Sequence, residues 1–331
     1  MVSTSRKGGI DRNRRKLVTD RLSSFFRIKN VLVREMLSEC LGTFILMVFG
    51  NGSVAQSVLS RQANGTYISI NWAFGLGVTM AVYVSGRVSG AHINPAVSIA
   101  FSAYGELPLY KLPCYIFAQV LGGFLSGAAV YSIYHDALYA FDGGVRQILG
   151  PNGTAGIFAT YPQSYLSLTS GLWDQIFGTA LLVGIIFAVT DKRNNDIVSG
   201  LQPLIIGFLV FTIGLSFGVN CGYAINPARD LGPRLFTSIA GWGSGVFTEP
   251  EGMYWFWIPI VGPILGGLLG STVYKLVVGV HLTEPGQQVR ETSIGRLAER
   301  EKEEIGECSK FADQNFNEKE KLHHSNSLTK F

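Results

Sequence analysis

The tripeptide Asn94-Pro95-Ala96 recurs as Asn226-Pro227-Ala228 in the second half of a very apolar chain. Asn is a favourable N-cap and Pro fits best at the first helical position, so each tripeptide predicts the start of a helix. Both copies lie next to long apolar stretches. Two helix starts at membrane depth indicate a path for a small solute between them.

The composition of the chain is that of a multi-pass membrane protein. Of its 331 residues, 47% are hydrophobic and only 15% are charged, and the mean hydropathy is +0.26. Stretches with at most one charge approach or exceed the roughly 20 residues that span a hydrocarbon core. The six predicted spans are Met36–Ser60, Ile68–Gly86, Leu112–Tyr134, Gln175–Thr190, Leu201–Asn226 and Met253–Tyr274. The fourth is short, and Asp174 and Asp191 at its ends are expected at the two membrane interfaces.

The distribution of charge predicts the orientation of the chain. Ten basic and two acidic residues precede residue 35, so the positive-inside rule places the N-terminus in the cytoplasm. Six crossings return the C-terminus to the same side, and Lys111 and Lys192-Arg193 then fall on inside loops. No removable signal peptide is expected, because the first span is too long for one. We expect a plasma-membrane protein, and the net charge of +4 does not indicate a nucleic-acid partner.

An internal repeat divides the apolar region into two halves. Glu39-Cys40-Leu41-Gly42-Thr43-Phe44 begins the first span and Gln175-Ile176-Phe177-Gly178-Thr179-Ala180 begins the fourth, each upstream of one Asn-Pro-Ala motif. Three spans in each half invert the second copy relative to the first. We therefore expect an all-α membrane protein with an inverted repeat, in which the two motifs approach from opposite faces.

Two apolar segments beside the motifs are too short to cross a membrane. They are 88–104 and 224–240, and both are predicted to be re-entrant half-helices. Irregular backbone at membrane depth must line a wet cavity or be buried in protein. The residues expected to offer carbonyl oxygens to a solute are Gly90, Ala91, His92, Ile93, Gly222, Tyr223 and Ala224.

The half-helix ends also predict which solutes are rejected. Each helix N-terminus carries about half a positive charge, so two facing ends oppose cations and hydronium but not neutral molecules. The side-chain amides of Asn94 and Asn226 are expected to point into the path as hydrogen-bond donors.

The predicted domain boundaries follow the changes in composition. Residues 1–33 form a basic cytoplasmic arm, and residues 34–278 form the membrane domain. Its repeats are about 34–140 and 170–278, joined by an extracellular loop. Residues 279–331 are charged and polar, and we expect a disordered cytoplasmic tail.

The two motif regions resemble the signatures of the aquaporin family. They are Ser89-Gly90-Ala91-His92-Ile93-Asn94-Pro95-Ala96-Val97 and Gly222-Tyr223-Ala224-Ile225-Asn226-Pro227-Ala228-Arg229-Asp230, and the similarity covers about residues 34–278. Leu231-Gly232-Pro233-Arg234, Tyr134 and Pro259-Ile260 are similar to the glycerol-conducting branch, the aquaglyceroporins. The resemblance implies a right-handed bundle of six transmembrane helices and two half-helices, assembled as a homotetramer in membrane lipid. It further implies a passive channel for glycerol, water, urea and other small neutral solutes that excludes protons and ions.

The resemblance also implies a selectivity filter of Phe74, Gly214, Tyr223 and Arg229. Two aromatic rings form an apolar wall for the carbon chain of a polyol, and the guanidinium offers donors to its hydroxyl oxygens. Gly214 is expected to leave the opening wide. By default, however, Phe74 in an apolar span is a packing residue, whereas Arg229 is too deep to be tolerated unless it faces water or carbonyls.

Other ionisable and polar residues have competing interpretations. Glu39 is either a proton relay or, as the family resemblance favours, an acceptor for the backbone of the re-entrant loop, with Gln175 as its repeat partner. Asp230 is expected to pair locally near the start of its half-helix. His92 is either a pH sensor or, as we expect, a hydrogen-bonding residue that orients the loop.

The remaining alternatives concern the class of function. A proton- or sodium-coupled polyol transporter would also suit inverted repeats and broken helices. We expect no enzyme, because no set of nucleophile, base and orienting residue is recognisable, and no cofactor, metal site or disulfide framework is predicted from the four cysteines. Asn64 and Asn152 begin possible glycosylation sequons on outside loops.

Overall fold

The computed structural model describes residues 24–194, 197–250, 254–283, 300 and 302. Predictions for the first 23 residues and for most of the tail therefore lie outside the described residues. The chain divides into two compact units, Met1–Val278 and Gly279–Phe331. In the second unit, the described residues include a short 3-10 helix at Gly279–His281. All further description concerns the first unit.

The described part of the first unit contains six long helices. The first half contains α2 (Val31–Leu59), α3 (Tyr67–Ser89) and α5 (Leu112–Asp142), and the second contains α6 (Leu168–Thr190), α7 (Gln202–Phe217) and α9 (Ile258–Val277). Four helical stretches of the described chain are long and apolar enough to cross a membrane: Tyr67–Ser89, Leu109–Asp142, Leu168–Thr190 and Trp255–His281. Helix α7 is apolar but shorter, and α2 carries Arg34, Glu35 and Glu39.

A half-helix begins at the proline of each Asn-Pro-Ala motif. Helix α4 covers Pro95–Ala103 and α8 covers Pro227–Ile239. The preceding asparagines are extended N-caps, with φ −159° at Asn94 and −153° at Asn226. Both helix starts predicted from the motifs are therefore confirmed.

Several predicted span boundaries are wrong. The first span begins at Val31 instead of Met36, and the third continues to Asp142 instead of ending at Tyr134. The fourth span starts seven residues earlier than predicted, at Leu168, where the side chain of Ser167 caps the helix. Asp174 consequently lies within α6, where its Oδ2 accepts a hydrogen bond of 2.9 Å from Asn220 Nδ2. The fifth span ends at Phe217 instead of Asn226, and left-handed φ values at Gly222 (75°) and Tyr223 (38°) are incompatible with a continued helix.

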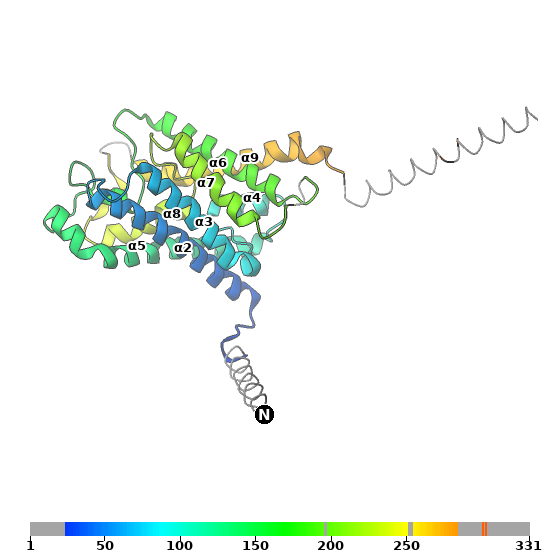
Figure 1. The fold of residues 1–331 in the computed structure, drawn as a ribbon, viewed down its shortest axis with the longest axis horizontal. Helices are drawn as coiled ribbons and strands as arrows, with labels where there is room; N and C mark the ends of the chain where they lie inside the picture. The colour runs from blue at the N-terminus through cyan, green and yellow to red at the C-terminus, as the bar shows by residue number, and fades with distance from the viewer. Residues whose placement is uncertain (1–23, 195–196, 251–253, 284–299, 301, 303–331) are drawn as a thin grey trace, which may run out of the picture. The chain divides into compact units, whose positions relative to one another are not determined.

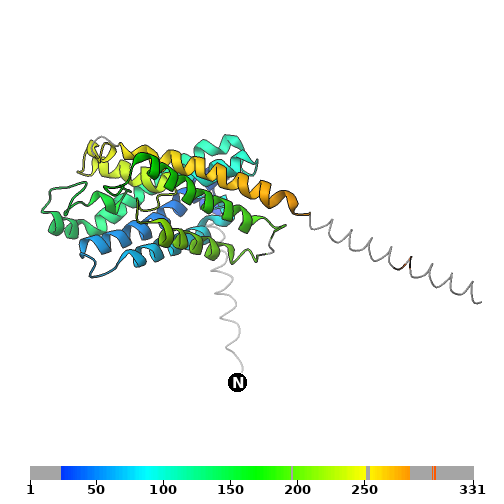
Figure 2. The same ribbon diagram turned by 90° about the horizontal axis from the view of Figure 1, so that it is seen from above.

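The same pairs of helices pack together in the two halves, and the half-helix of each half packs against a long helix of the other half. Helix α2 packs on α3 and α5, and α6 packs on α7 and α9. Helix α8 lies against α5 of the first half, and α4 lies against α9 of the second (Figure 1). In Figure 2 the long helices run side by side. A side chain added at Gly122 would collide with the carbonyl of Cys40, and one added at Gly266 would collide with the carbonyl of the repeat-related Ile176. Glycine permits the same close approach in both halves.

Candidate functional site

The two Asn-Pro-Ala motifs meet head to head, and the asparagine side chain of each donates a hydrogen bond to the residue that precedes the other motif. Asn94 Nδ2 donates to the carbonyl of Ile225 at 2.9 Å, and Asn226 Nδ2 donates to the carbonyl of Ile93 at 2.8 Å. The side-chain oxygens cap their own helices, with Ala96 N 2.9 Å from Asn94 Oδ1 and Ala228 N 3.0 Å from Asn226 Oδ1. Each amide nitrogen carries a second hydrogen that these bonds do not use.

The backbone before each motif follows the same strained path. In the first loop, Gly90 has φ 89°, and Ile93, next to Asn94, has φ 45°. In the second loop, Gly222 has φ 75° and Ile225 has φ 39°. A β-branched residue is rarely left-handed, and such a conformation costs about 1–2 kcal/mol. Surrounding groups must therefore hold both loops.

Glu39 supports the first loop with four hydrogen bonds. Its Oε1 accepts from Ser89 Oγ at 2.6 Å and from His92 N at 2.9 Å. Its Oε2 accepts from Ile93 N at 2.7 Å and from Gln119 Nε2 at 2.8 Å. The predicted backbone acceptor is therefore present in the structure, and the carboxylate is wholly buried.

Gln175 supports the second loop with fewer contacts. Its Oε1 accepts from Ile225 N at 2.9 Å, which repeats the contact of Glu39 with Ile93. Its Nε2 donates to Asp174 Oδ1 at 3.0 Å and lies 3.1 Å from Cys221 Sγ.

His92 is held in place by neighbours of the first loop. Its Nδ1 lies 3.1 Å from Ser98 Oγ, and its ring packs 4.9 Å from the ring of Phe101 and 5.4 Å from that of Tyr115. This geometry suits the loop-orienting role expected from the sequence.

Two cavities lie on the predicted path, and only the first reaches the motifs. The first has a volume of about 420 Å³ and is lined by the loop residues Gly90, Ala91, His92, Ile93 and Ala224 together with both motif asparagines. The second has a volume of about 460 Å³ and is lined by Gly222 and by residues of the segment between the repeats. The two linings share three residues, Phe74, Tyr223 and Arg229.

These three shared residues form a compact group. The Arg229 guanidinium carbon lies 4.9 Å from the Phe74 ring centroid, and the Phe74 and Tyr223 rings meet edge to face at 6.0 Å and 75°. Arg229 Nη1 donates to the carbonyl of Phe158 at 3.4 Å, which is the one hydrogen bond of this guanidinium within the described residues. Its remaining donors are therefore available on the cavity side.

Gly214, the fourth predicted filter residue, lies beside the ring of Tyr223. It is not among the described residues that line the two cavities. A Cβ added to it would lie 2.7 Å from Tyr223 Cζ and 2.6 Å from Asn71 Oδ1. Glycine at this position leaves room for the ring of Tyr223 and the amide of Asn71, and the place of Gly214 in the filter stays a prediction.

The chain is similar to known membrane channels over most of its length. Residues 27–274 match the model of the major intrinsic protein family. The chain belongs to this family. It is 49% identical to aquaporin-10 of the tardigrade Milnesium tardigradum, over 88% of this chain and 74% of that protein, and 51% identical to human aquaporin-9, over 78% and 87%.

A solved structure also resembles this member of the family. The X-ray structure of the aquaglyceroporin from Plasmodium falciparum superposes with a TM-score of 0.68 at 33% identity, covering 75% of this chain and 98% of that one. These findings confirm the aquaporin fold and the aquaglyceroporin branch that the motifs indicate. The protein is a channel for water and glycerol, and the comparisons do not favour a coupled transporter.

An ion pair in this aquaglyceroporin attaches the segment between the repeats to α8. Asp230 Oδ1 accepts from Arg234 Nε at 2.8 Å, which is the local pairing expected from the sequence. Asp230 Oδ2 also accepts from Thr160 N at 2.7 Å, and Arg234 Nη1 donates to the carbonyl of Val246 at 2.6 Å. Sequence reasoning missed Phe158 and Thr160, since the segment that carries them has no motif.

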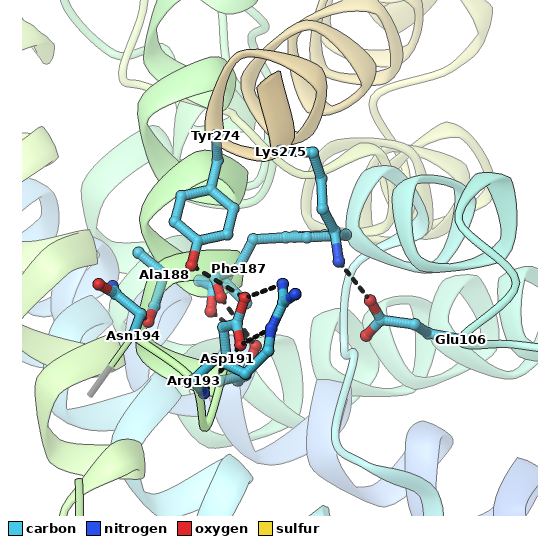
Figure 3. A network of polar contacts seen from close by, with 10 residues as sticks. Glu106, Phe187, Ala188, Asp191, Arg193, Asn194, Tyr274 and Lys275 are labelled. Carbon is cyan, nitrogen blue, oxygen red and sulfur yellow. Dashed lines mark hydrogen bonds and ion pairs between the residues drawn. The ribbon is translucent and has the colours of Figure 1, made fainter. Parts of the chain in front are cut away.

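A second polar network lies where α6 and α9 end (Figure 3). Tyr274 points its hydroxyl at Asp191 Oδ2, 3.1 Å away, and Arg193 Nη2 lies 2.8 Å from the same oxygen. Lys275 Nζ reaches Glu106 Oε1 at 3.1 Å. The hydrogen bonds from Arg193 hold the pKa of Asp191 at about 2, below its ordinary 3.8.

The two sequons of the channel differ in accessibility. Asn64 is exposed. Asn152 is half-buried, and its Oδ1 accepts from Arg61 Nη2 at 3.4 Å. Thr154 of the same sequon is wholly buried, and its hydroxyl accepts from Trp242 Nε1 at 3.1 Å.

Proposed function

We propose that Phe74, Gly214, Tyr223 and Arg229 form the selectivity filter of a passive channel for glycerol, water, urea and other small neutral solutes. The observation that supports this most strongly is that Phe74, Tyr223 and Arg229 are the only described residues that line both cavities. Gly214 leaves room for the ring of Tyr223. A polyol crossing from one cavity to the other would meet two ring surfaces and a guanidinium. The rings suit its carbon chain, and the guanidinium suits its hydroxyl oxygens.

The exclusion of protons and ions would come from positive charge on both sides of the motifs. The N-termini of α4 and α8 each contribute about half a charge, and Arg229 contributes a full one. A cation loses hydration in the narrow passage without gaining a negative partner there. A neutral solute is not opposed in this way, and its hydroxyls can accept the second amide hydrogens of Asn94 and Asn226.

We also propose the membrane compartment, the orientation and the oligomeric state of the channel. We place the channel in the plasma membrane. Both termini are assigned to the cytoplasm, because the basic residues before the first span favour that orientation. Large apolar side chains exposed on the long helices, such as Phe117, Ile133 and Leu276, suit contact with lipid or with neighbouring copies in a homotetramer. No catalytic step and no cofactor is assigned.

Asn64 is the better candidate for glycosylation. Its side chain is exposed, whereas Asn152 is half-buried and bonded to Arg61. In a secreting eukaryotic host, Asn64→Gln should abolish a glycosidase-sensitive shift in gel mobility, and Asn152→Gln should leave it unchanged. The opposite pattern would reverse the assignment.

The passive mechanism is tested in proteoliposomes by stopped-flow volume change with water, glycerol and urea. We expect glycerol flux that rises linearly with its gradient and is unaffected by a protonophore. Glycerol uptake that saturates and collapses with the protonophore would contradict a passive channel.

The filter is tested with Arg229→Val, assayed for proton and cation leak in the same vesicles. Removing the charge should raise the leak, because the passage loses its fixed cation. Arg61→Val is the matched control, since Arg61 also lies over an aromatic ring, 4.6 Å from the centroid of Phe141, but outside the passage. An unchanged leak in Arg229→Val, or an equal leak in both variants, would count against the barrier role of Arg229.

A further inference from the structure

The segment between the repeats touches the proposed filter through a backbone carbonyl. Directly after the 3-10 helix Ala155–Ile157, the carbonyl of Phe158 accepts the hydrogen bond of Arg229 Nη1 at 3.4 Å. Within the described residues the guanidinium makes no other hydrogen bond, so its direction on this side depends on where the carbonyl lies. The next two residues, Ala159 and Thr160, line the second cavity. What holds this short stretch therefore also sets the position of the carbonyl.

Thr160 attaches the stretch to α8 with all of its polar groups. Its backbone N–H and its hydroxyl both donate to Asp230 Oδ2, at 2.7 and 2.5 Å, and its carbonyl accepts from Arg234 Nη2 at 2.5 Å. Its hydroxyl oxygen also accepts from Trp255 Nε1 at 3.4 Å. Asp230 and Arg234 are paired with each other at 2.8 Å and are wholly buried. A buried network in which each member is bonded is rigid, so Thr160 is fixed relative to α8.

The attachment of Thr160 and the contact of Arg229 are close together along the chain at both ends. Arg229 and Asp230 are adjacent in α8, and one residue separates Phe158 from Thr160 in the segment. A shift of Thr160 is therefore passed to the carbonyl that Arg229 binds. Any residue provides the backbone N–H and carbonyl used here, whereas the hydroxyl requires threonine or serine.

We propose that Thr160 is a positioning residue of the filter, whose hydroxyl bond to Asp230 keeps the Phe158 carbonyl at Arg229 and thereby fixes the direction of the guanidinium. This inference rests on the proposed filter. A guanidinium presents its donors in a planar fork, which meets two neighbouring hydroxyls of a polyol only in a suitable orientation. A water molecule needs a single donor. A guanidinium that is no longer held therefore impairs the passage of glycerol more than that of water.

The test is a double-mutant cycle of Thr160→Val and Arg229→Val, with the ratio of glycerol to water permeability measured in proteoliposomes. Thr160→Val keeps the backbone bonds but loses the hydroxyl, and it should lower the ratio about 2- to 10-fold, the range that corresponds to one hydrogen bond. Thr160→Ser keeps the hydroxyl and should retain most of the ratio. In the Arg229→Val background, Thr160→Val should have no further effect, because the group that it positions is absent. If Thr160→Val does not fold, Thr160→Ala carries the same expectation without placing a methyl group against Asp230.

The control is Thr237→Val, which removes another wholly buried threonine hydroxyl of α8. Thr237 Oγ1 donates to the carbonyl of Arg234 at 2.9 Å, and Thr237 is not among the described residues that line the two cavities. Its ratio should equal that of the unmodified channel, and an equal loss in Thr160→Val and Thr237→Val would overturn the specific role of Thr160.

Two further outcomes would overturn the inference and leave the filter intact. The first is an unchanged ratio in Thr160→Val. The second is a loss that persists in the Arg229→Val background, since Thr160 would then act on the passage without Arg229. If Arg229→Val itself leaves both the ratio and the cation leak unaltered, the proposed filter fails.

Discussion

The two re-entrant loops follow the same backbone path but are supported by different chemistry. In the first loop, one buried carboxylate, Glu39, receives four hydrogen bonds. In the second, Gln175 accepts one backbone N–H, and the ion pair of Asp230 with Arg234 attaches a distant segment to the half-helix. The shared requirement is a partner for the N–H of Ile93 and of Ile225, the two left-handed residues before the motifs. The repeat preserves that bond and leaves the remaining support free to differ.

The largest expected effect comes from removing the ion pair of the second half. Asp230→Ala leaves the wholly buried guanidinium of Arg234 without its carboxylate, which should lower the stability by about 3–5 kcal/mol. The measurement is thermal unfolding of the purified protein in detergent. Glu106→Ala is the control, because its ion pair with Lys275 is partly exposed and should contribute about 0–1 kcal/mol. Equal losses in the two variants would show that burial of the pair is unimportant.

Replacing the carboxylate of the first loop should have the next largest effect. Glu39→Gln keeps the size of the side chain but turns one acceptor into a donor that faces the N–H of Ile93 or of His92. We expect a loss of about 2 kcal/mol, the usual contribution of a hydrogen bond to a charged group, and reduced glycerol flux per channel. Unaltered unfolding and flux would show that an amide supports either loop equally well.

A smaller effect is expected for the corresponding change in the second loop. Gln175→Leu removes the acceptor for the N–H of Ile225 while the Asp230 contacts remain, so the loss should be about 1 kcal/mol. Unfolding of this variant and of Glu39→Gln is compared under one set of conditions. A larger loss for Gln175→Leu would reverse the proposed order of support.

The smallest effect is expected outside both loops, at Asp191. Because Arg193 lowers the folded-state pKa of Asp191 from 3.8 to about 2, the ionised form stabilises the fold above about pH 4. This contribution is lost as the pH falls from about 4 toward 2. Asp191→Asn should lower the stability at pH 7 by about 1 kcal/mol or less, and the difference from the unmodified protein should vanish under acid conditions. A difference that grows on acidification would contradict the assignment.

The amino-acid sequence predicts the parts of the site that depend on local rules. Asn and Pro at fixed positions specify a cap and a first turn, so the starts of both half-helices could be placed to the residue. Glu39 stands out because a lone carboxylate in an apolar span needs partners. The end of α7 was missed, because an apolar run does not reveal where left-handed residues interrupt it.

The sequence also does not predict contacts between side chains from distant segments. Asn71 has no motif, and its place beside Tyr223 follows only from the packing of α3 on α7. Phe158 provides a backbone carbonyl, which any residue offers, so its identity carries no signal. The family pattern places Gly214 in the filter, but the sequence does not reveal that its missing side chain leaves room for the ring of Tyr223.

The reciprocal bonds of Asn94 with Ile225 and of Asn226 with Ile93 have a consequence for biosynthesis. Each half supplies the carbonyl that the asparagine of the other half requires. During translation, the first half therefore enters the bilayer before its loop can be completed, and the last bonds of both loops form together. If the chain were divided between α5 and α6, each separately produced fragment would lack the carbonyl that its motif asparagine binds, so neither loop could be completed without the other fragment.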